Sequence, residues 1–337
     1  MKSCKLVSVV ILNWNGEKYI HECISSVIDQ TYSNIEIIIV DNDSSDGSFQ
    51  KIQKNYPALV YEKNIANLGY AEGVNIGIAK SKGDFVMLLG YDVYLSETYI
   101  EKAITKIDTN TKIGVIAGPE FAWADGIKSD VHLASSGSYY LKKRLQVGIS
   151  EDKDKEQISF GVTGSFPIIR KALFDDLYNV SGHYFDKAFE TGWEDTDFRF
   201  RAILRGWKTL YFPEIHAWHV GSASDNENTR LIDKSIDYQK RIFRNRLYVI
   251  EKNLPQNVKK EIGIYLKITN ILMYFYYLIK SPKSLKAIKN AKIEFNNNIK
   301  KVIIKRNNIL ENVIISDEEL LGYFKKYYHL KVGIHNK

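Results

Sequence analysis

The chain has 337 residues, of which 45% are apolar and 26% are charged, and its formal net charge is +7. This composition is that of a folded soluble protein and excludes a disordered or fibrous chain. The two cysteines, Cys4 and Cys23, lack the spacing of a metal site and are too few for a disulfide framework, so a reducing, cytoplasmic setting is expected.

The charge is unevenly distributed along the chain. Residues 251–337 contain 17 Lys and Arg against 7 Asp and Glu, whereas residues 1–250 contain 30 against 33. We therefore expect a main domain at 1–250 and a basic extension at 251–337. A basic extension favours contact with an anionic surface, either a membrane or a nucleic acid.

The first hundred residues predict a parallel sheet. Apolar runs rich in β-branched residues indicate strands, and segments of helical character lie between them. The expected strands are 7–12, 35–40, 59–63 and 85–89, and the expected helices are 16–30, 48–56 and 70–79. Such alternation is typical of an α/β fold whose mostly parallel sheet is covered by helices on both faces, as in nucleotide-binding proteins.

Polar side chains follow three of the expected strands. Asn13 and Asn15 follow the first, Asp41 begins a polar loop after the second, and Asp92 follows the strand at 85–89. Turn chemistry explains each loop singly. Ligands of such sheets bind at the carboxyl ends of the strands, so the shared position predicts a site. The dinucleotide and P-loop glycine motifs are absent from the sequence.

An acidic cluster stands in the second half of the chain. Glu194, Asp195 and Asp197 lie within four residues, and His219 follows about two dozen residues later. Carboxylates in such a cluster need a cation, a proton or a substrate hydroxyl. The combination suggests a general base beside a metal ligand. The alternative is a helix N-terminus whose acidic residues suit the helix dipole, with an unrelated surface histidine.

Several motifs together resemble glycosyltransferase family 2, and in particular its rhamnosyltransferase-like branch. They are VVILNWNG at 9–16, VDNDSSDGS at 40–48, NLGYAEGVNIG at 67–77, GSFPIIR at 164–170, EDTDF at 194–198 and HVGS at 219–222. The resemblance covers about residues 7–250. It implies a GT-A nucleotide-sugar fold as the catalytic domain at 1–250, followed by a helical extension at 251–337.

The resemblance implies an inverting transferase with three groups of site residues. Asp195 would be the general base, and Asp92 and His219 would bind Mn²⁺ or Mg²⁺ on the donor diphosphate. The nucleotide-sugar would be bound by Asn13, Asn15, Asp41, Asn42, Ser44, Asn67, Gly69, Asn75 and Tyr91, with Asp41 on the base. The acceptor would be bound by Glu194, Asp197, Trp193, Gly164 and Ser165.

One position departs from the family pattern. The family carries Asp or Asn two residues before its last metal-binding Asp, whereas this chain has Gly90 there. Glycine offers no side-chain ligand, so metal affinity is weaker, or rests on Asp92, His219 and the phosphates alone, or is not needed. This departure leaves open an alternative function, a catalytically impaired protein that binds nucleotide-sugars.

The segment from 113 to 160 is less informative. We expect a strand at 113–118, a loop at 121–126 and a solvated loop at the charged run 151–156. The aromatic side chains of Trp123, Tyr139 and Tyr140 suit stacking on a sugar, and packing explains them equally well.

The C-terminal region, from Ile232 onward, is expected to be helical. Its basic cluster of Arg241, Arg244 and Arg246 fits either a phosphate clamp or a solvated helix face. The apolar stretch 262–279 has a nearly uninterrupted part, 271–279, that is too short to span a bilayer. With the lysines that follow, it predicts an interfacial helix attracted to anionic lipids. The alternatives are a soluble helical hairpin and an oligomer contact.

These features predict the partners and the location of the protein. The donor would be dTDP-rhamnose or a UDP-hexose, and the acceptor a hydroxyl of a cell-surface glycan or a lipid-linked saccharide. No nucleic-acid reader motif occurs, so no nucleic-acid partner is expected. Oligomerisation is left open. The expected location is the cytoplasm, at the inner face of the plasma membrane.

Overall fold

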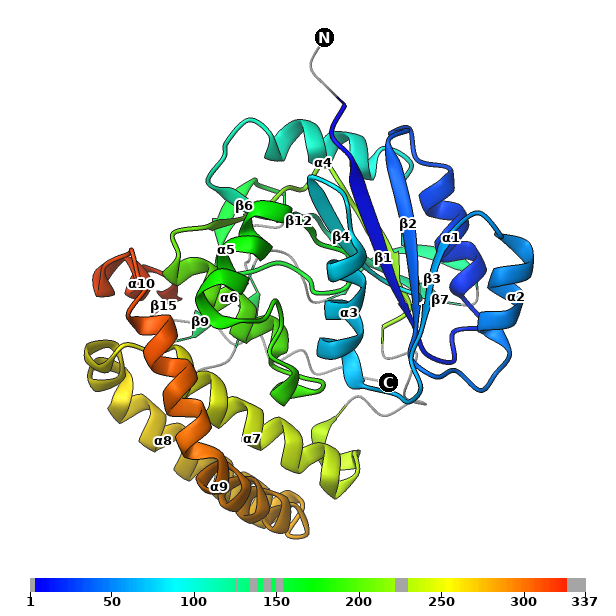
Figure 1. Cartoon of the computed structure of the whole chain (residues 1–337). Coiled ribbons are helices and arrows are strands. Elements are labelled where there is room, and N and C mark those ends of the chain that lie inside the picture. Colours follow the sequence, from blue (N-terminus) through cyan, green and yellow to red (C-terminus); the bar gives the residue numbers. More distant parts are fainter. Residues whose placement is uncertain are drawn as a thin grey trace.

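The computed structural model describes residues 4–124, 126–133, 138–141, 147–149, 154–221 and 230–325. An α/β body carries a group of long helices on one side (Figure 1). Four features singled out in the sequence lie outside the described residues: Ser222, the charged residues 151–153, and the side chains of Tyr139 and Tyr140.

The body is built on an eight-stranded mixed sheet with the order β11-β13-β6-β12-β4-β1-β2-β3. Strands β1 to β4 are mutually parallel where they pair, and β12 runs against both of its neighbours. The bounds are β1 Val7–Asn13, β2 Ile35–Asp41, β3 Val60–Lys63, β4 Phe85–Gly90, β6 Ile113–Ala117, β11 Gln157–Ser159, β12 Ile168–Arg170 and β13 Lys208–Tyr211. The expected strands of the first hundred residues and the strand near 113–118 are confirmed.

Six helices belong to this body. Their bounds are α1 Ile20–Ile28, α2 Ser48–Asn55, α3 Gly69–Lys80, α4 Tyr99–Ile107, α5 Lys171–Ser181 and α6 Glu194–Leu204. The first helix begins four residues later than expected, because Asn15 has a left-handed backbone (φ 53°) and residues 16–19 form a turn before it. The core between the helices and the sheet is made of the apolar residues of β1, β2 and β4, such as Val9, Ile38 and Met87.

The strand register brings the predicted site loops to one edge of the sheet. Asn13 at the end of β1 is aligned with Asp41 at the end of β2, and Leu12 is aligned with Gly90 at the end of β4. Between β1 and β4 the chain switches direction across the sheet, since β2 and β3 lie on the other side of β1. Such a switch point opens a crevice for ligands.

A second sheet of four strands has the order β5-β14-β7-β8. Its bounds are β5 Val93–Leu95, β7 Glu120–Ala124, β8 Ile127–His132 and β14 Ala217–His219. The loop expected at 121–126 is therefore wrong for residues 121–124. Phe121 and Trp123 alternate with alanines, the two-residue period of a strand, and β7 pairs with β14, almost a hundred residues later. A third sheet contains β10 Val147–Ile149, β9 Ser138–Leu141 and β15 Phe324–Lys325.

The C-terminal region is helical, as expected. It consists of α7 Ile236–Asn253, α8 Gln256–Lys280, α9 Ser284–Leu310 and α10 Asp317–Gly322. Helix α7 runs through residue 250, and a second hydrophobic cluster joins Phe189 and Phe200 of the body to Val249, Val258 and Ile309 of these helices. The helices thus share a core with the body, and the division into domains at residue 250 stays a prediction.

Helix α8 contains the whole apolar stretch 262–279. By length and composition alone it could cross a membrane, and its most apolar part is largely exposed in the structure. Only Val258, Ile262 and Tyr277 of this helix are buried.

Candidate active site

A cleft of about 740 Å³ opens at the carboxyl ends of β1 and β4. It is walled by residues from both halves of the chain, including Trp14 after β1, Tyr70 on α3 and Arg241 on α7. Ten of the predicted site residues line it: Asn42, Asn67, Gly69, Tyr91, Asp92, Gly164, Ser165, Glu194, Asp195 and His219. The fold therefore brings the two predicted clusters, one from each half of the sequence, into one cleft.

Asp92 and His219 face each other on one wall of the cleft. His219 lies on β14, which pairs with β5, and Asp92 immediately precedes β5. His219 Nε2 is 3.3 Å from Asp92 Oδ2, and its Nδ1 pairs with Glu120 Oε1. Burial by itself would lower the pKa of His219, but its hydrogen bonds to Asp92 and Glu120 raise that pKa to about 10. The imidazole is therefore charged at neutral pH in the absence of other ligands.

Glu120 is a functional residue that the sequence analysis missed. It begins β7, where Glu120 lies beside Ala217 of β14, and it is buried at 7% exposure. A carboxylate on one ring nitrogen of a histidine fixes which nitrogen faces the other way. Glu120 therefore directs Nε2 of His219 toward Asp92. The only sequence signal was a charged residue opening an aromatic run that alternates with alanines.

Asp195 stands at the first turn of α6. Gly192 and Trp193 both have left-handed backbones (φ 87° and 73°), which turn the chain sharply into the helix. Asp195 Oδ1 accepts hydrogen bonds from the Thr196 amide at 2.6 Å, and Oδ2 lies 2.9 Å from Arg199 Nη2. Its side chain is 38% exposed, which makes it accessible from the cleft. Gly164 lies next to this carboxylate, since a Cβ there would be 3.9 Å from Asp195 Oδ2, an ordinary van der Waals contact.

Residues 164 and 165 connect the two sides of the site. Gly164 lies against Asp195, and Ser165 Oγ is 3.4 Å from His219 Nδ1. The Ser165 carbonyl also accepts a 2.8 Å hydrogen bond from the Gly90 amide at the end of β4. Residues 164 and 165 therefore connect Asp195 to the Asp92–His219 pair.

Glu194 is a buried carboxyl group in the cleft wall. It is 8% exposed, and its Oε2 has no hydrogen-bond partner among the described residues. Burial, together with the charge of Asp195, raises the pKa of Glu194 to about 8. Glu194 is therefore mostly protonated at neutral pH and can donate a hydrogen bond, whereas Asp195 next to it is paired with a cation.

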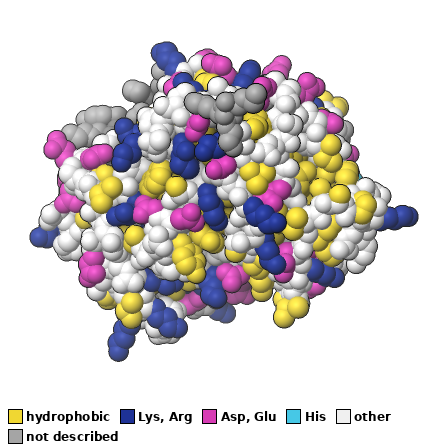
Figure 2. Space-filling view, turned by 45° about the horizontal axis from the view of Figure 1, so that its top comes forward, with side chains coloured by type: hydrophobic (Ala, Val, Ile, Leu, Met, Phe, Trp, Pro, Cys, Tyr) yellow, Lys and Arg dark blue, Asp and Glu magenta, His cyan; other side chains and the backbone are white. Residues whose placement is uncertain are grey.

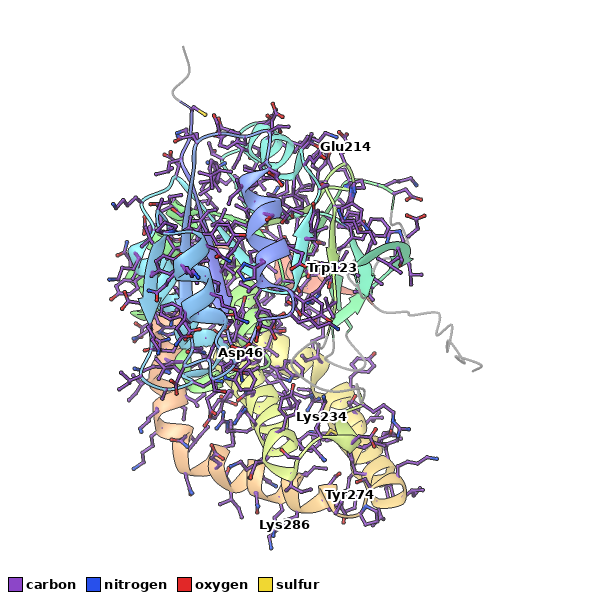
Figure 3. All side chains as sticks on the ribbon, turned by 90° about the vertical axis from the view of Figure 1, so that its right-hand side faces the viewer. Asp46, Trp123, Glu214, Lys234, Tyr274 and Lys286 are labelled. Carbon is purple, nitrogen blue, oxygen red and sulfur yellow. The ribbon has the colours of Figure 1, made fainter. Side chains whose placement is uncertain are left out.

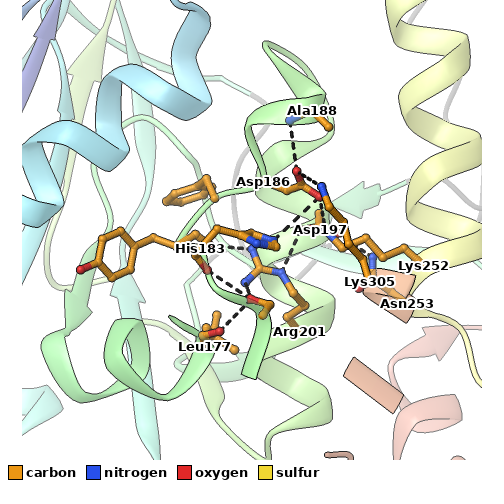
Figure 4. A network of polar contacts seen from close by, with 12 residues as sticks. Leu177, His183, Asp186, Ala188, Asp197, Arg201, Lys252, Asn253 and Lys305 are labelled. Atoms are coloured by element: carbon orange, nitrogen blue, oxygen red, sulfur yellow. Dashed lines mark hydrogen bonds and ion pairs between the residues drawn. The ribbon is translucent and has the colours of Figure 1, made fainter. Parts of the chain in front are cut away.

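Asp197 does not face the cleft, and the acceptor-binding role expected for it is a misassignment. It is fully buried, with Oδ2 2.9 Å from Arg201 Nε and Oδ1 2.9 Å from Lys252 Nζ (Figure 4). Successive helical residues turn by about 100°, so Asp197 lies about 200° around α6 from Asp195. Trp193 likewise lines no part of the cleft and packs against the second hydrophobic cluster.

The Asp197 pair belongs to a buried ionic network. Lys252 of α7 lies 2.7 Å from Asp186, which is also 2.7 Å from Lys305 of α9, and Asn253 donates to Asp197 at 2.8 Å (Figure 4). Burial opposes ionisation of both carboxyl groups, but Lys252 and the other cations hold the pKa values of Asp186 and Asp197 below their usual range. The network ties α6 to the C-terminal helices.

A polar network lies at the ends of β1 and β2. Asn13 Nδ2 donates to Asp41 Oδ1 at 2.8 Å and to Ser44 Oγ at 3.1 Å, and Ser44 Oγ also accepts from the Asn15 amide at 3.0 Å. Asn13 and Asp41 are fully buried, and Asn13 Oδ1 has no hydrogen-bond partner among the described residues. These four predicted donor-binding residues are thus brought together, with Asn15 exposed and Ser44 half-buried, but none of them lines the cleft.

Asn42 and Asn67 shape the wall on the side of α3. Asn42 Nδ2 donates to Asn67 Oδ1 and to the Gly69 carbonyl, both at 3.1 Å, while Asn42 Oδ1 accepts from Asn64 at 2.9 Å. Gly69 opens α3 with a left-handed backbone (φ 78°), and a Cβ there would meet the Glu190 carbonyl at 3.0 Å.

Asn75 does not line the cleft, and the direct donor contact expected for it is not available. Its Oδ1 accepts from the Phe185 amide at 2.9 Å, and its Nδ2 donates to the Phe185 carbonyl at 2.8 Å. Both ends of the amide are therefore used to hold the backbone of Phe185, whose ring is part of the cleft wall and stacks on Phe198. Asn75 positions a wall residue.

The arginines of the basic cluster on α7 make different contacts. Arg241 lines the cleft and lies 3.0 Å from Glu190, whereas Arg244 is buried and donates to the Ala188 carbonyl at 3.0 Å. Asn245 donates to the carbonyls of Phe189 and Gly192, each at 2.7 Å. These contacts hold residues 188–192, the segment that leads into Glu194 and Asp195. Of the two expectations for this cluster, a solvated face is wrong for Arg244.

The residues at this site fit a divalent cation that arrives with a diphosphate. The described residues contain no group of three or more His, Cys, Asp or Glu arranged to hold a metal by themselves. Asp92 and His219 supply one oxygen and one nitrogen that converge, with Glu120 behind the histidine as metal-binding histidines commonly have. Phosphate oxygens and water would complete the coordination.

Comparison with known proteins identifies the family. Residues 8–177, half of the chain, match the family model described as Glycosyl transferase family 2. The chain belongs to glycosyltransferase family 2. An uncharacterised glycosyltransferase of Haemophilus influenzae is 35% identical over 116 residues, 34% of this chain and 36% of that protein. Glycosyltransferase GlyG of Streptococcus pneumoniae is 26% identical over 191 residues, 54% of this chain and 62% of that protein. The chain thus spans less than two thirds of either relative.

Solved structures show the fold. S. aureus TarS 1–349 in complex with UDP-GlcNAc has a TM-score of 0.58 at 18% identity, with 91% of this chain and 89% of that chain covered. GalNAc-T7 with UDP, GalNAc and Mn²⁺ has a TM-score of 0.59 at 15% identity, with 89% of this chain and 58% of that chain covered. This glycosyltransferase family 2 chain therefore has the GT-A fold, a mixed α/β sheet with flanking helices, followed by a C-terminal helical region.

Proposed function

We propose that this family 2 chain is an inverting glycosyltransferase that moves one sugar from a nucleotide-diphosphate donor to a hydroxyl of a cell-surface glycan or lipid-linked saccharide. The observation that carries the proposal is the position of Asp195. Its accessible carboxylate shares one cleft with the Asp92–His219 pair, and Gly164 and Ser165 lie between them. A proton acceptor thus faces a group suited to bind a diphosphate.

The donor would lie along the carboxyl ends of β1, β2 and β4. Asn42, Asn67, Gly69 and Tyr91 line this part of the cleft, and Asn13, Asn15, Asp41 and Ser44 form a hydrogen-bonded network at the ends of β1 and β2. We assign the nucleoside to this side. The base contact expected for Asp41 is not available, because this carboxylate is fully buried and its two oxygens accept from Asn13 Nδ2 at 2.8 Å and from the Ser44 amide at 3.0 Å. Asp41 would therefore support the polar loop after β2.

Asp195 would act on the acceptor. It takes the proton of the acceptor hydroxyl while that oxygen attacks the anomeric carbon of the donor sugar, and the bond from that carbon to the diphosphate oxygen breaks. The leaving group is the nucleoside diphosphate, and one displacement inverts the anomeric centre. Arg199 holds the carboxylate through its 2.9 Å contact. Glu194, protonated at neutral pH, would donate a hydrogen bond to the acceptor.

Asp92 and His219 would hold Mn²⁺ or Mg²⁺ against the diphosphate. The bound cation would offset the negative charge of the departing diphosphate. Because His219 is protonated in the free protein, cation binding at Nε2 requires loss of that proton. The mixed nitrogen and oxygen donors favour Mn²⁺ over Mg²⁺, and the structural neighbour GalNAc-T7 was solved with Mn²⁺.

The sequence motifs and the structural neighbours support a narrower proposal for the donor sugar. dTDP-rhamnose follows from the rhamnosyltransferase-like motifs, and a UDP-hexose is supported by the neighbour TarS, which was solved with UDP-GlcNAc. We place the reaction in the cytoplasm at the inner face of the plasma membrane, where nucleotide-sugar donors and lipid-linked acceptors meet.

The second candidate function is a catalytically impaired nucleotide-sugar-binding protein, which Gly90 favours. A Cβ at this position would lie 2.9 Å from Asp92 Oδ1, so the missing ligand is not simply replaceable. The test is a thermal-shift screen of nucleotide-sugars with and without Mn²⁺, followed by release of nucleoside diphosphate from the donor that binds. Turnover with that donor supports the transferase. Tight binding without turnover, on every acceptor class tried, supports the impaired protein.

A further inference from the structure

The second half of α8 exposes a continuous apolar surface. Six large side chains on one face near its C-terminal end are between 42% and 75% exposed: Ile271, Leu272, Tyr274, Phe275, Leu278 and Ile279; Tyr276 beside them is 48% exposed. An exposed apolar surface of this size on a soluble body marks an interaction site. We call these six residues the α8 tip. In Figure 3, Tyr274 lies on the helices below the α/β body, well away from Trp123.

The chain around the α8 tip carries only positive charge. Residues 262–293 contain six lysines and no Asp or Glu. Lys280, Lys283, Lys286 and Lys289 follow the tip at intervals of three residues and are all exposed, and Lys286 lies at the outer end of the helices in Figure 3. Elsewhere, on the face in Figure 2, side chains of both charges are intermixed. The stretch 262–293 is thus apolar and cationic.

The opposite side of α8 is held against the protein. Tyr277 packs edge-on against Phe243 of α7 at 5.2 Å, and Arg246 of α7 donates to Asn270 at 2.9 Å. Val258 and Ile262 at the start of α8 are buried in the second hydrophobic cluster. Crossing a bilayer would require all of these contacts to break along the length of the helix. The helix is therefore built to lie on a surface rather than to pass through it.

We propose that the α8 tip and the lysines that follow it seat the enzyme on an anionic lipid bilayer. The apolar side chains enter the boundary between headgroups and acyl chains, and the lysines pair with lipid phosphates. The charge pattern argues against a second copy as the occupant, because two tips facing each other would bring lysines of the same sign together.

Helix α7 lies between α8 and the cleft. A third hydrophobic cluster joins Tyr277 and Ala287 to Ile236 and Phe243 in the first turns of α7. Tyr238 and Arg241 of the same turns line the cleft. Resting on the proposed function, this position one helix away from the cleft assigns the acceptor to the lipid-linked class, since the membrane would hold such an acceptor on the same side of the protein as α7.

The proposed binding of the α8 tip to a bilayer can be tested with the full chain and vesicles of known composition. We would measure co-sedimentation with phosphatidylcholine vesicles and with vesicles of equal phosphatidylcholine and phosphatidylglycerol. One variant combines Phe275→Ser with Ile279→Ser, and a second combines Lys283→Gln with Lys286→Gln. The matched control combines Ile127→Ser on β8, which is 69% exposed, with Lys112→Gln, an exposed lysine before β6.

We expect binding that prefers the anionic vesicles and that falls roughly tenfold or more in each tip variant, while the control binds like the unmodified chain. Release of nucleoside diphosphate from a soluble donor should be unchanged in the tip variants. Equal binding to both vesicle types, tip variants that bind normally, or retention after alkaline carbonate extraction would overturn the proposal. So would a solution dimer that Phe275→Ser with Ile279→Ser dissociates. Vesicle binding without any sugar transfer would refute the proposed transferase activity but not the proposed contact with the membrane.

Discussion

Arg199 Nη2 lies 2.9 Å from Asp195 Oδ2, and the same nitrogen donates to the Val162 carbonyl at 2.5 Å. Arg199 is one helical turn after Asp195, so the pair is set by the geometry of α6. Because the guanidinium is anchored to the backbone of Val162, it fixes the direction in which the carboxylate points. Arg199 is therefore a positioning residue for the proposed base.

Arg199→Ala should lower kcat roughly 10- to 100-fold by letting the Asp195 carboxylate rotate, with little change in KM for the donor. Arg199→Lys should recover part of the loss, since an ammonium group keeps the charge but not the planar, rigid geometry of the guanidinium. Steady-state kinetics at saturating acceptor would show this. An Arg199→Ala enzyme with unchanged kcat would exclude a positioning role.

The ionic network beneath α6 should dominate stability. Lys252 is 1% exposed and pairs with both Asp186 and Asp197. Lys252→Met leaves two buried carboxylates short of a cation, and we expect a loss of about 3–5 kcal/mol in the free energy of unfolding. Urea unfolding measures it. Lys260→Met, at an exposed lysine on α8, is the matched control and should change stability little. Equal losses in both variants would contradict the network's importance.

Mild acid should destabilise the fold through His183. Burial, with Arg201 and Lys252 close by, lowers the pKa of His183 from 6.5 to about 3. As the pH falls below 6.5, the unfolded chain takes up a proton that the folded chain refuses, so stability is lost, by at most about 1.4 kcal/mol per pH unit. Asp186 and Asp197, whose pKa values are lowered, add a further loss below about pH 3.8.

Urea midpoints from neutral pH to about pH 4.5 would test this expectation. His183→Gln should flatten the dependence between about pH 6.5 and 4.5, whereas His21→Gln on α1 should leave it as in the unmodified chain. A slope that survives in His183→Gln would assign the acid sensitivity to other groups.

Restoring the family's acidic residue at position 90 should not improve the enzyme. A Cβ there would meet Asp92 Oδ1 at 2.9 Å and Val93 at 3.3 Å. Gly90→Asp and Gly90→Ala should therefore both displace Asp92 and raise the Mn²⁺ concentration needed for half-maximal activity. Titration of activity with Mn²⁺ compares them. If Gly90→Asp binds Mn²⁺ more tightly than the unmodified chain, crowding at Asp92 is not the reason for glycine.

The sequence predicted the parts of the site that depend on local pattern. The strands ending at Asn13, Asp41 and Gly90 are continuous apolar runs. In a parallel sheet the carboxyl ends of neighbouring strands lie at the same edge, so the residues that follow these strands are close together. Asp195 and His219 were found through motifs. Their approach to Asp92 depends on β14 pairing with β5 and β7, which are about a hundred residues away.

What the sequence could not supply was the direction of each side chain. Asp197 stands two residues from Asp195 and was grouped with it, but the helical turn directs it into the buried network with Lys252. Neither Glu120 nor Arg199 lies in one of the motifs. Glu120 contacts His219, which is distant in the sequence, and Arg199 contacts Asp195 and the Val162 carbonyl. Arg244 was predicted as part of a basic cluster with Arg241 and Arg246, whereas its burial, and that of Asn245, against residues 188–192 depends on the packing of α7 on the body.

The most direct test of the account is Asp195→Asn, which keeps the shape of the side chain and removes its basicity. The measurements are single-turnover sugar transfer and donor affinity by calorimetry on the same preparations, at saturating Mn²⁺. We predict that transfer falls at least about a thousandfold while the donor Kd stays within about twofold. Transfer at the rate of the unmodified enzyme would remove Asp195 from the chemistry and contradict the proposed mechanism.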